Sequence, residues 1–362
     1  MVTCLSCCEE GFFCASNPEN FINKGSEARG WNIKKKIMTF LVSGLLTLSL
    51  LAVSACGTQN TAKQDTGPAS SKTVQLQETI NGTAYTMTFD SVPQRAVSLS
   101  QFSTELLLAL GLQEKMVGTA FLEEPISPKV KEAYAKVPVL SEKWPAQEVF
   151  FQAKPDFAIG WEVAFSKKGV EAANVISQGI KVFIPKSTTE SNANMDTLFE
   201  DIRTLGAIFD VRDRAESYIQ QEQQRIKTVQ EKLAKLPPRS VFIFDSGDQE
   251  PFTVYEGFTS HLLLQAGMKN VMAGKGVKKT WGKANWEEVI AANPDYILIV
   301  EYDTANRGQS DYESKVQYLK ENPRLQTIKA VQKQAFLRVR LAEIVPGIRN
   351  VDLLERLAAQ RE

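Results

Sequence analysis

From residue 73 onward, short apolar runs alternate with stretches whose apolar positions recur with helical spacing. Seven of the runs are predicted strands, and they cover residues 96–99, 116–119, 157–160, 181–184, 241–244, 296–300 and 336–339. Ahead of them, residues 73–92 place apolar side chains on both sides of Asn81-Gly82, a dipeptide typical of a two-residue hairpin turn. The pattern predicts a leading hairpin followed by two sets of α/β units.

A long polar segment separates the two sets of predicted strands. Its apolar residues recur every three or four positions in a first run, Leu198, Ile202, Leu205 and Phe209, and a second run continues a helical stripe: Ile219, Ile226, Val229, Leu233 and Leu236. Asp213 is a candidate helix cap, and Pro237-Pro238 would end the helix. We therefore predict one long helix over residues 196–238, joining an N-terminal α/β lobe (73–195) to a C-terminal α/β lobe (239–362). The alternative is one more packing helix of a single domain.

The two halves share a Glu-x6-Pro-Asp unit that leads into a predicted strand. The unit runs from Glu148 to Asp156 in the first half and from Glu287 to Asp295 in the second. Locally it predicts a helix that ends at a proline, after which the chain enters a sheet. Two such units, one on each side of the linker, indicate two similar lobes. We expect the aspartates to cap or turn the chain rather than to bind a ligand.

The N-terminal part has the organisation of an export signal. Three lysines at 34–36 precede an uncharged apolar run over residues 37–53, and the sequence Val-Ser-Ala then leads to Cys56. Small residues directly before a cysteine resemble a bacterial lipobox, in which that cysteine is lipidated and becomes the mature N-terminus. We predict an upstream extension and lipoprotein signal peptide over 1–55, lipid attachment at Cys56, and a flexible tether over 56–72. The alternative is an ordinary secretory signal with an incidental cysteine.

Residues 1–32 precede the lysines and are more than such a signal needs. A start codon placed too far upstream would explain them. The alternative is a metal knuckle, but the four cysteines of this stretch have no second pair downstream: Cys4, Cys7, Cys8 and Cys14. No cysteine follows Cys56, so we expect no disulfide in the main body.

Charge and composition exclude several classes of function. The 362 residues carry 42 basic and 42 acidic side chains, so no basic field points to nucleic acid, and the hydrophobic content of 43% is that of a folded chain. A single histidine, His261, excludes metal sites built from imidazole clusters, and a receptor for a bare metal ion would need carboxylates alone. Neither a G-x-S-x-G elbow, an H-E-x-x-H helix nor a P-loop is present, so we expect no enzyme.

Several segments, taken in order, resemble the substrate-binding proteins of bacterial ABC importers, in the branch that serves ferric siderophores, cobalamin and haem. These are residues 95–112, the two Glu-x6-Pro-Asp units, and residues 160–165, 245–252, 266–271 and 341–352. The resemblance covers residues 73 to about 360. It implies two Rossmann-like lobes joined by a single long helix, a ligand cleft between the lobes, and little closure on binding.

The resemblance also implies what the protein does. The expected function is capture of a ferric siderophore outside the cytoplasm and its delivery to an ABC permease with its cytoplasmic ATPase. We expect a monomer, held on the cell membrane by a lipid anchor, that needs no cofactor because metal arrives only within the transported chelate. The alternatives are a cobalamin or haem receptor of the same importer class, or a lipoprotein that senses a ligand for a signalling partner.

In open α/β sheets, ligands lie beyond the carboxyl ends of the strands. Ser100 and Gln101 follow the first predicted strand and head a helix whose free N–H groups would suit an anionic oxygen. Six further side chains are predicted to bind the ligand: Phe102, Phe121, Trp161, Trp281, Tyr302 and Arg340. Aromatic faces and a guanidinium suit a bulky chelate that is partly apolar and partly anionic. For each aromatic taken alone, core packing is the alternative role.

Glu148 and Glu287 take a different role from the resemblance. In the family, one glutamate of each lobe docks onto arginines of the permease, and these two residues match that pattern by position. Two separated carboxylates can fix orientation through charge pairing. The alternative is a pair of solvated glutamates on helix surfaces. Three other charged residues, Glu123, Glu124 and Arg349, are interpreted as rim charges and are left out of the site.

Overall fold

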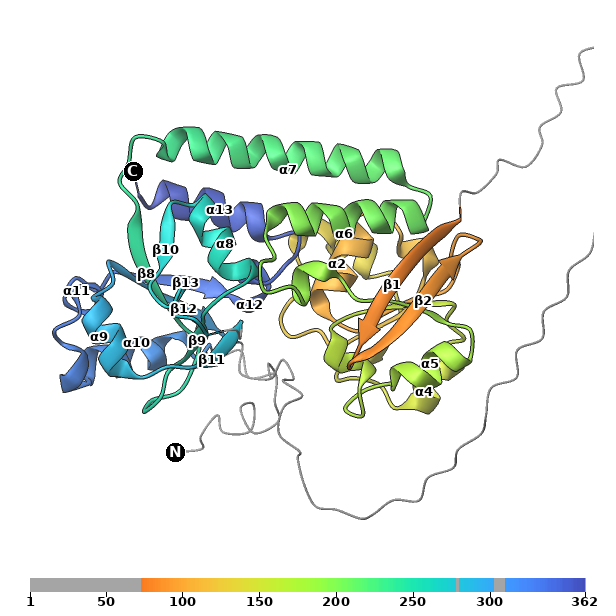
Figure 1. The fold of residues 1–362 in the computed structure, drawn as a ribbon, viewed down its shortest axis with the longest axis horizontal. Helices are drawn as coiled ribbons and strands as arrows, with labels where there is room; N and C mark the ends of the chain where they lie inside the picture. The colour runs from red at the N-terminus through yellow and green to blue at the C-terminus, as the bar shows by residue number, and fades with distance from the viewer. Residues whose placement is uncertain (1–72, 278–279, 303–309, 362) are drawn as a thin grey trace, which may run out of the picture. The chain divides into compact units, whose positions relative to one another are not determined.

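The computed structural model describes residues 73–277, 280–302 and 310–361 (Figure 1). The predicted signal peptide, the lipid attachment site at Cys56 and the tether lie outside the described residues. Within the described ranges, no helix combines the length and the apolar character that crossing a membrane requires.

The described chain begins with the predicted hairpin, formed by β1 (Val74–Ile80) and β2 (Thr83–Phe89). The strands pair antiparallel, with Ile80 opposite Thr83. At the turn between them Asn81 has φ 50° and Gly82 has φ 78°. A type I′ turn needs this left-handed backbone at both central residues, which explains the Asn-Gly sequence. The predicted hairpin is confirmed.

The N-terminal lobe contains a parallel sheet of five strands in the order β5-β4-β3-β6-β7. The strands are β3 (Ala96–Ser98), β4 (Met116–Ala120), β5 (Val139–Ser141), β6 (Phe157–Ile159) and β7 (Lys181–Phe183). Their connecting helices are α2 (Gln101–Ala109), α3 (Lys131–Tyr134), α4 (Gln147–Gln152) and α5 (Ala172–Ser177). The four predicted strands are confirmed, and β5 is an additional short strand. Because the chain order reverses at β3, a ligand is expected beyond the carboxyl end of that strand.

The C-terminal lobe contains a parallel sheet of four strands in the order β10-β8-β12-β13. These are β8 (Arg239–Phe244), β10 (Met268–Asn270), β12 (Tyr296–Glu301) and β13 (Phe336–Arg340), and a separate antiparallel pair is formed by β9 (Phe252–Val254) and β11 (Trp281–Lys283). The helices are α8 (Phe258–Gln265), α9 (Trp286–Ala292), α10 (Tyr312–Glu321), α11 (Lys329–Gln332), α12 (Leu341–Ile344) and α13 (Asn350–Ala359). The three predicted strands are confirmed. Here the chain order reverses between β8 and β12.

Two helices occupy the segment that was expected to be one. α6 (Met195–Ile208) begins with a capping box made by Asn194 and Thr197, and α7 (Arg212–Leu233) follows after a break at residues 209–211. The long helix is therefore present, but the predicted start at residue 196 is wrong. The break occurs because Asp210 adopts a left-handed backbone with φ 55°, which ends a right-handed helix. Asp213 lies in the first turn of α7 but does not cap it.

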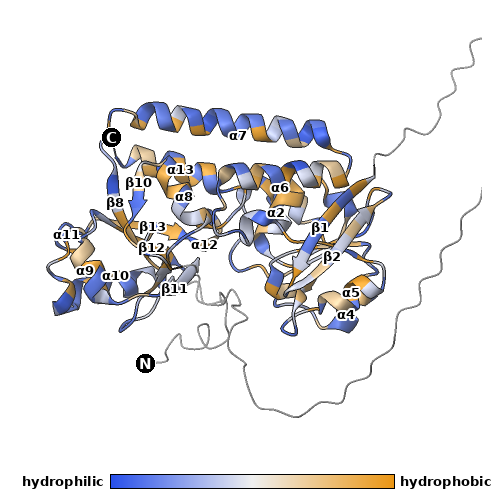
Figure 2. Cartoon of the chain, in the orientation of Figure 1, coloured by the Kyte–Doolittle hydropathy of each residue, from blue (hydrophilic) through white to orange (hydrophobic). Residues whose placement is uncertain are grey.

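The long helix α7 packs along α6 and α13 (Figure 1). Figure 2 shows that most of its surface is hydrophilic. Its buried side chains follow one stripe: Ala215, Ile219, Glu222, Ile226, Val229 and Leu233. A helix with one narrow apolar stripe gains stability only from packing that stripe against neighbours. The predicted stripe in the second part of the linker is thus confirmed, with Leu236 beyond the end of the helix.

The two Glu-x6-Pro-Asp units have the same local structure. Each begins in a short helix, α4 or α9, and leaves it through a left-handed residue directly before the proline: Lys154 with φ 48° and Asn293 with φ 44°. Asp156 then accepts hydrogen bonds from the N–H groups of the two residues before β3 at 2.8 and 2.9 Å. Asp295 accepts from the N–H of Ser240, in β8, at 3.0 Å. Both aspartates therefore hold the start of a neighbouring strand, a role that differs from the expected local cap or turn.

Candidate functional site

Buried hydroxyl groups fill the carboxyl end of the N-terminal sheet. Thr104 Oγ1 lies 2.7 Å from the hydroxyls of both Ser98 and Thr119, and all three side chains are fully buried. Ser100 and Gln101 are also buried, so the start of α2 is covered. The expectation that its N–H groups face an anionic ligand is therefore wrong, because protein covers this helix end.

Gln101 instead holds the loop that follows β4. Its side-chain oxygen accepts hydrogen bonds from the N–H groups of Glu123 and Glu124, at 3.0 and 2.9 Å. The same loop starts at Phe121, whose φ of 60° is a strained value for an aromatic residue. Phe121 stacks on Trp144 with ring centroids 4.6 Å apart. These contacts fix the backbone on which two acidic side chains are carried.

Ion pairs connect this loop and α2 to the C-terminal lobe. Arg349 Nε donates to Glu105 Oε2 at 3.0 Å, and Arg349 Nη1 lies 3.2 Å from Glu124 Oε2. Glu124 Oε1 also accepts the backbone N–H of Ala342 at 2.8 Å. The Glu105 and Glu124 side chains are only 2% and 6% exposed. Removing one member of such a buried pair leaves the other charge unpaired, so the pairing holds the two lobes together.

Arg340 joins the same set of charges. Its guanidinium nitrogens lie 3.6 Å from Glu124 and 3.7 Å from Glu301, one carboxylate from each lobe. Glu301 is also paired with Arg338, at 2.7 Å for one of the two contacts. The pKa of Glu301 is lowered, first by the hydrogen bond from Arg338. Arg340 therefore sits between two acids, and its charge is already matched by the protein.

Glu123 differs from the other acids of this region. Its carboxyl group forms no hydrogen bond or ion pair with any described residue, although the side chain is half-buried. Burial, and then the negative charges of Glu124 and Glu105, raise the pKa of Glu123 to about 8. Glu123 is therefore a half-buried acid, close after a strand end, that lacks a partner among the described residues.

In the C-terminal lobe, Tyr302 and Asp245 meet where the chain order reverses. The Tyr302 hydroxyl donates to Asp245 Oδ1 at 2.6 Å, and the ammonium of Lys315 lies 4.9 Å from the centre of the Tyr302 ring. Burial raises the pKa of Asp245. Burial, Asp245 and then Glu123 raise the pKa of Tyr302. The two lobes meet beside this pair, because Arg340, at the end of the neighbouring strand β13, lies 3.6 Å from Glu124 of the N-terminal lobe.

The six predicted ligand-binding side chains fall into two groups. Trp161, Tyr302 and Arg340 are half-buried at strand ends, as expected. Phe102, Phe121 and Trp281 are buried, with 3%, 6% and 8% exposure. Phe102 packs on Trp161 at 4.4 Å between ring centroids, whereas Trp281 lies in β11 and stacks on Phe252 at 6.1 Å. The structure thus places Phe102 against Trp161. It also places Arg340 in contact with the N-terminal lobe.

The charged residues set aside as rim charges lie inside the inter-lobe region. Arg349 is 12% exposed between Glu105 and Glu124, and Glu105 was not singled out from the sequence. The interpretation as rim charges is wrong for Glu124 and Arg349, because their side chains are only 6% and 12% exposed and pair with each other across the lobes. One signal was available: Glu123 and Glu124 come shortly after the end of β4, a strand end that was already assigned to the site through Phe121.

The two predicted docking glutamates occupy equivalent positions. Glu148 is the second residue of α4 and Glu287 the second residue of α9, and both are exposed. Glu148 pairs with no described residue. Glu287 forms an ion pair with Arg324. A backbone hydrogen bond at its own helix start, and then Arg324, lower the pKa of Glu287.

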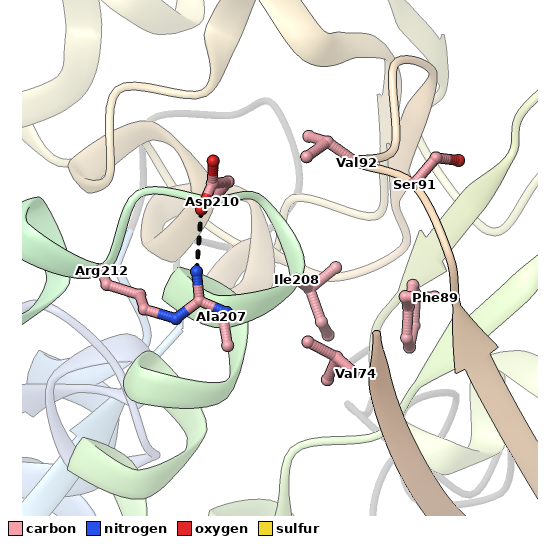
Figure 3. Close-up of a pocket in the computed structure, with 8 residues that line it drawn as sticks. All are labelled: Val74, Phe89, Ser91, Val92, Ala207, Ile208, Asp210 and Arg212. Atoms are coloured by element: carbon pink, nitrogen blue, oxygen red, sulfur yellow. Dashed lines mark hydrogen bonds and ion pairs between the residues drawn. The ribbon is translucent and has the colours of Figure 1, made fainter. Parts of the chain in front are cut away.

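Two hollows in the surface lie away from the strand ends. The first, of about 20 Å³, is lined by the hairpin, the end of α6 and the Asp210–Arg212 ion pair at 2.8 Å (Figure 3). Room for little more than one water makes it too small for a chelate. The second, of about 320 Å³, lies among α6, α7 and α8 and includes His261. His261 Nδ1 forms a hydrogen bond with the carbonyl oxygen of Ala193 at 2.9 Å. Among the described residues, no group of three or more His, Cys, Asp and Glu side chains is arranged to hold a metal ion.

Comparisons with known proteins agree with this geometry. Residues 97–339 match the model of the periplasmic binding protein family. The chain is 26% identical over 256 residues to an uncharacterized ABC transporter substrate-binding lipoprotein of Bacillus subtilis, covering 69% of this chain and 78% of that protein. It is 26% identical over 211 residues to the vitamin B12-binding protein of Yersinia pestis, covering 57% and 69%. A periplasmic binding protein of Veillonella parvula has a solved structure that is 47% identical, covers 80% of this chain and 98% of its own, and gives a TM-score of 0.78.

Proposed function

The chain belongs to the periplasmic binding protein family and is an extracytoplasmic substrate-binding protein of an ABC importer, and on this premise we propose that its ligand is a ferric siderophore. The observation that carries the proposal is the group of side chains at the ends of both sheets. Trp161 and Tyr302 are half-buried there, and Arg340 reaches Glu124 across the lobes at 3.6 Å. Aromatic faces beside fixed charges suit a bulky chelate with both apolar and polar surface.

We also propose how the loaded protein is held and emptied. A lipid on Cys56 and the tether that follows keep the folded part close to the permease, and the relative in Bacillus subtilis is named a lipoprotein. Glu148 and Glu287, at the starts of equivalent helices, dock on arginines of the permease. The iron enters as cargo within the chelate, so no resident cofactor is part of the proposal.

Tryptophan fluorescence of the purified protein tests the ligand class. The titrants are a ferric trihydroxamate, a ferric tricatecholate, cyanocobalamin, haem and free ferric iron, with equilibrium dialysis as a second measure. We expect saturable quenching by a siderophore that Trp161→Phe removes. Trp286→Phe is the matched control, because Trp286 is 1% exposed in the C-terminal core and should leave the quenching in place. Folded protein that binds neither siderophore would overturn the proposal.

Cobalamin is the second candidate, because several of the curated relatives are vitamin B12-binding proteins. A corrinoid would use the same half-buried aromatic side chains, Trp161 and Tyr302. The two candidates separate in the same titration. Saturable binding of cyanocobalamin alone, lost in Trp161→Phe, would replace the siderophore by cobalamin and leave the importer function standing.

A further inference from the structure

Acidic groups outnumber basic ones where the two sheets meet. Among the charged groups that pair at the described strand ends, together with Glu123, the acids are Glu105, Glu123, Glu124, Asp245, Glu301, Asp311 and Glu343, and the basic groups are Lys315, Arg338, Arg340, Arg349 and Arg356. Every arginine of this set is already paired with at least one carboxylate. A ligand that brings additional negative charge would therefore find no described guanidinium free to receive it.

Glu123 is a half-buried acid whose carboxyl group has no partner among the described residues. The backbone N–H of Glu123 donates to Gln101 Oε1 at 3.0 Å, so the side chain starts from a held position beside Glu124, which pairs with Arg349 of the C-terminal lobe. The Glu123 carboxyl group has no partner among the described residues, whereas Glu124, the next residue, has Arg349 at 3.2 Å and the N–H of Ala342 at 2.8 Å. A half-buried carboxyl group gains from a hydrogen-bond donor or a cation, and within the described chain it has neither.

We propose that Glu123 is a specificity-determining residue that receives a cationic or hydrogen-bond-donating group of the ligand, so that the protein selects chelates without net negative charge. The inference rests on the proposed function, because the family's role, and not the acidic cluster, places a ligand between the lobes. It narrows the ligand class from siderophores in general to neutral or cationic ones, such as hydroxamate chelates that carry an amine.

The electrostatics of the region support this assignment. Two acids act on Glu123, Glu105 from α2 and Glu124 from its own loop, and Arg340 and Arg349 pair with Glu124. Glu123 contributes to the raised pKa of Tyr302 in the C-terminal lobe, and the centre of the Tyr302 ring lies 4.9 Å from the ammonium of Lys315. Burial and the neighbouring acids raise the pKa of Glu123 to about 8. A bound cation favours the ionised carboxylate, so its affinity must increase as the pH rises from 6 to 9. A neutral carboxylic acid that donates to an anionic ligand would give the opposite slope.

A pair of probes that differ only in charge provides the test. The first is a linear ferric trihydroxamate with a terminal ammonium group, the second is the same chelate with that amine acetylated, and a ferric tricatecholate is the anionic comparison. With the purified full chain, we expect the ammonium form to bind about tenfold more tightly than the acetylated form at pH 8, with the tricatecholate weakest. Glu123→Gln should remove the difference between the first two. Glu114→Gln, an exposed carboxylate on the surface, should leave it unchanged.

The outcomes separate the inference from the function on which it rests. Binding of the tricatecholate in preference to both hydroxamates overturns the role of Glu123 but keeps the siderophore receptor. An unchanged preference in Glu123→Gln, or an affinity for the ammonium form that falls between pH 6 and 9, also overturns that role. If the folded protein binds none of the three chelates, the siderophore proposal fails and the inference fails with it. Thermal unfolding of Glu123→Gln, expected to match the parent protein, shows that any loss concerns recognition.

Discussion

The two Glu-x6-Pro-Asp units have the same backbone conformation, but their exposed glutamates have different surroundings. In each lobe the aspartate bonds twice to one residue of an earlier part of the chain, Arg95 directly before β3 or Ser240 near the start of β8. The aspartate N–H donates to the carbonyl of that residue, and the aspartate carboxylate accepts its N–H. At the other end of the unit, Glu148 pairs with no described residue while Glu287 is held by Arg324. The aspartate end of the unit, here called the inner end, therefore has the same bonds to the sheet in both lobes. The exposed glutamate end, the outer end, differs between the lobes.

This difference bears on how the protein would meet its permease. An exposed carboxylate without a partner can pair with an incoming arginine directly, whereas Glu287 must first give up or share Arg324. Both glutamates lie in the first turn of a helix, where the helix dipole favours negative charge. The two equivalent positions thus carry carboxylates that differ in how easily they can pair with an arginine of the permease. We expect Glu148 to contribute more to docking than Glu287.

Charge reversal at both glutamates should produce the largest effect. We expect Glu148→Arg with Glu287→Arg to reduce uptake of the labelled ligand at least about a hundredfold, because like charges would then face the permease. The single change at Glu148 should cost more than the one at Glu287. Uptake by whole cells is the measurement, and ligand affinity of the purified variants should stay within about twofold. Normal uptake by the double variant would show that these residues do not dock the permease.

Removal of each aspartate tests how much its hydrogen bonds to the neighbouring strand stabilise the protein. Asp156→Ala should lower the free energy of unfolding by about 1 kcal/mol, because the N–H groups that it releases lie at exposed residues and can bind water. Asp295→Ala should cost about 2 kcal/mol, because Asp295 also accepts from the Ser240 hydroxyl at 3.1 Å and pairs with Lys329. Urea unfolding measures both values.

The matching asparagine variants serve as controls for this pair. Asp156→Asn and Asp295→Asn keep one acceptor oxygen and should recover about half of each loss. An Asp156→Ala variant less stable than Asp295→Ala would mean that the extra partners of Asp295 contribute nothing. In that case the two units would be equivalent at their inner ends despite their different surroundings.

Most strands could be predicted from the sequence because each is a short apolar run bounded by a turn. The hairpin could also be predicted, since few dipeptides other than Asn-Gly place two left-handed residues at a turn. The break before α7 was not predicted, because apolar spacing continues through Phe209 and the reversal depends on the backbone of one residue, Asp210. Spacing reports which face of a helix is buried, but not whether the chain turns between two helices with the same buried face.

The sequence predicted where the side chains of the candidate site lie better than it predicted their ion pairs. The rule that ligands lie beyond strand ends selected Trp161, Tyr302 and Arg340, and the structure places all three half-buried there. It did not indicate that Arg340 is neutralised by Glu124 of the other lobe. Pairing across lobes joins residues more than two hundred positions apart, and local sequence carries no signal for it. The excess of acid around Glu123 follows from that pairing and was missed for the same reason.

The smallest expected effect comes from releasing Glu287. Arg324→Ala removes its ion-pair partner, and because both side chains are more than half exposed, we expect no measurable change in the free energy of unfolding. Docking should instead improve by about twofold to threefold, as the freed carboxylate becomes equivalent to Glu148. The measurement is the concentration of loaded protein that half-saturates transport by the permease in vesicles, with Lys320→Ala on the neighbouring helix as the control for loss of one positive charge. Weaker docking by Arg324→Ala, with Lys320→Ala unchanged, would mean that Arg324 itself contacts the permease. The two lobes would then dock through different chemistry, acid on one side and an acid–arginine pair on the other.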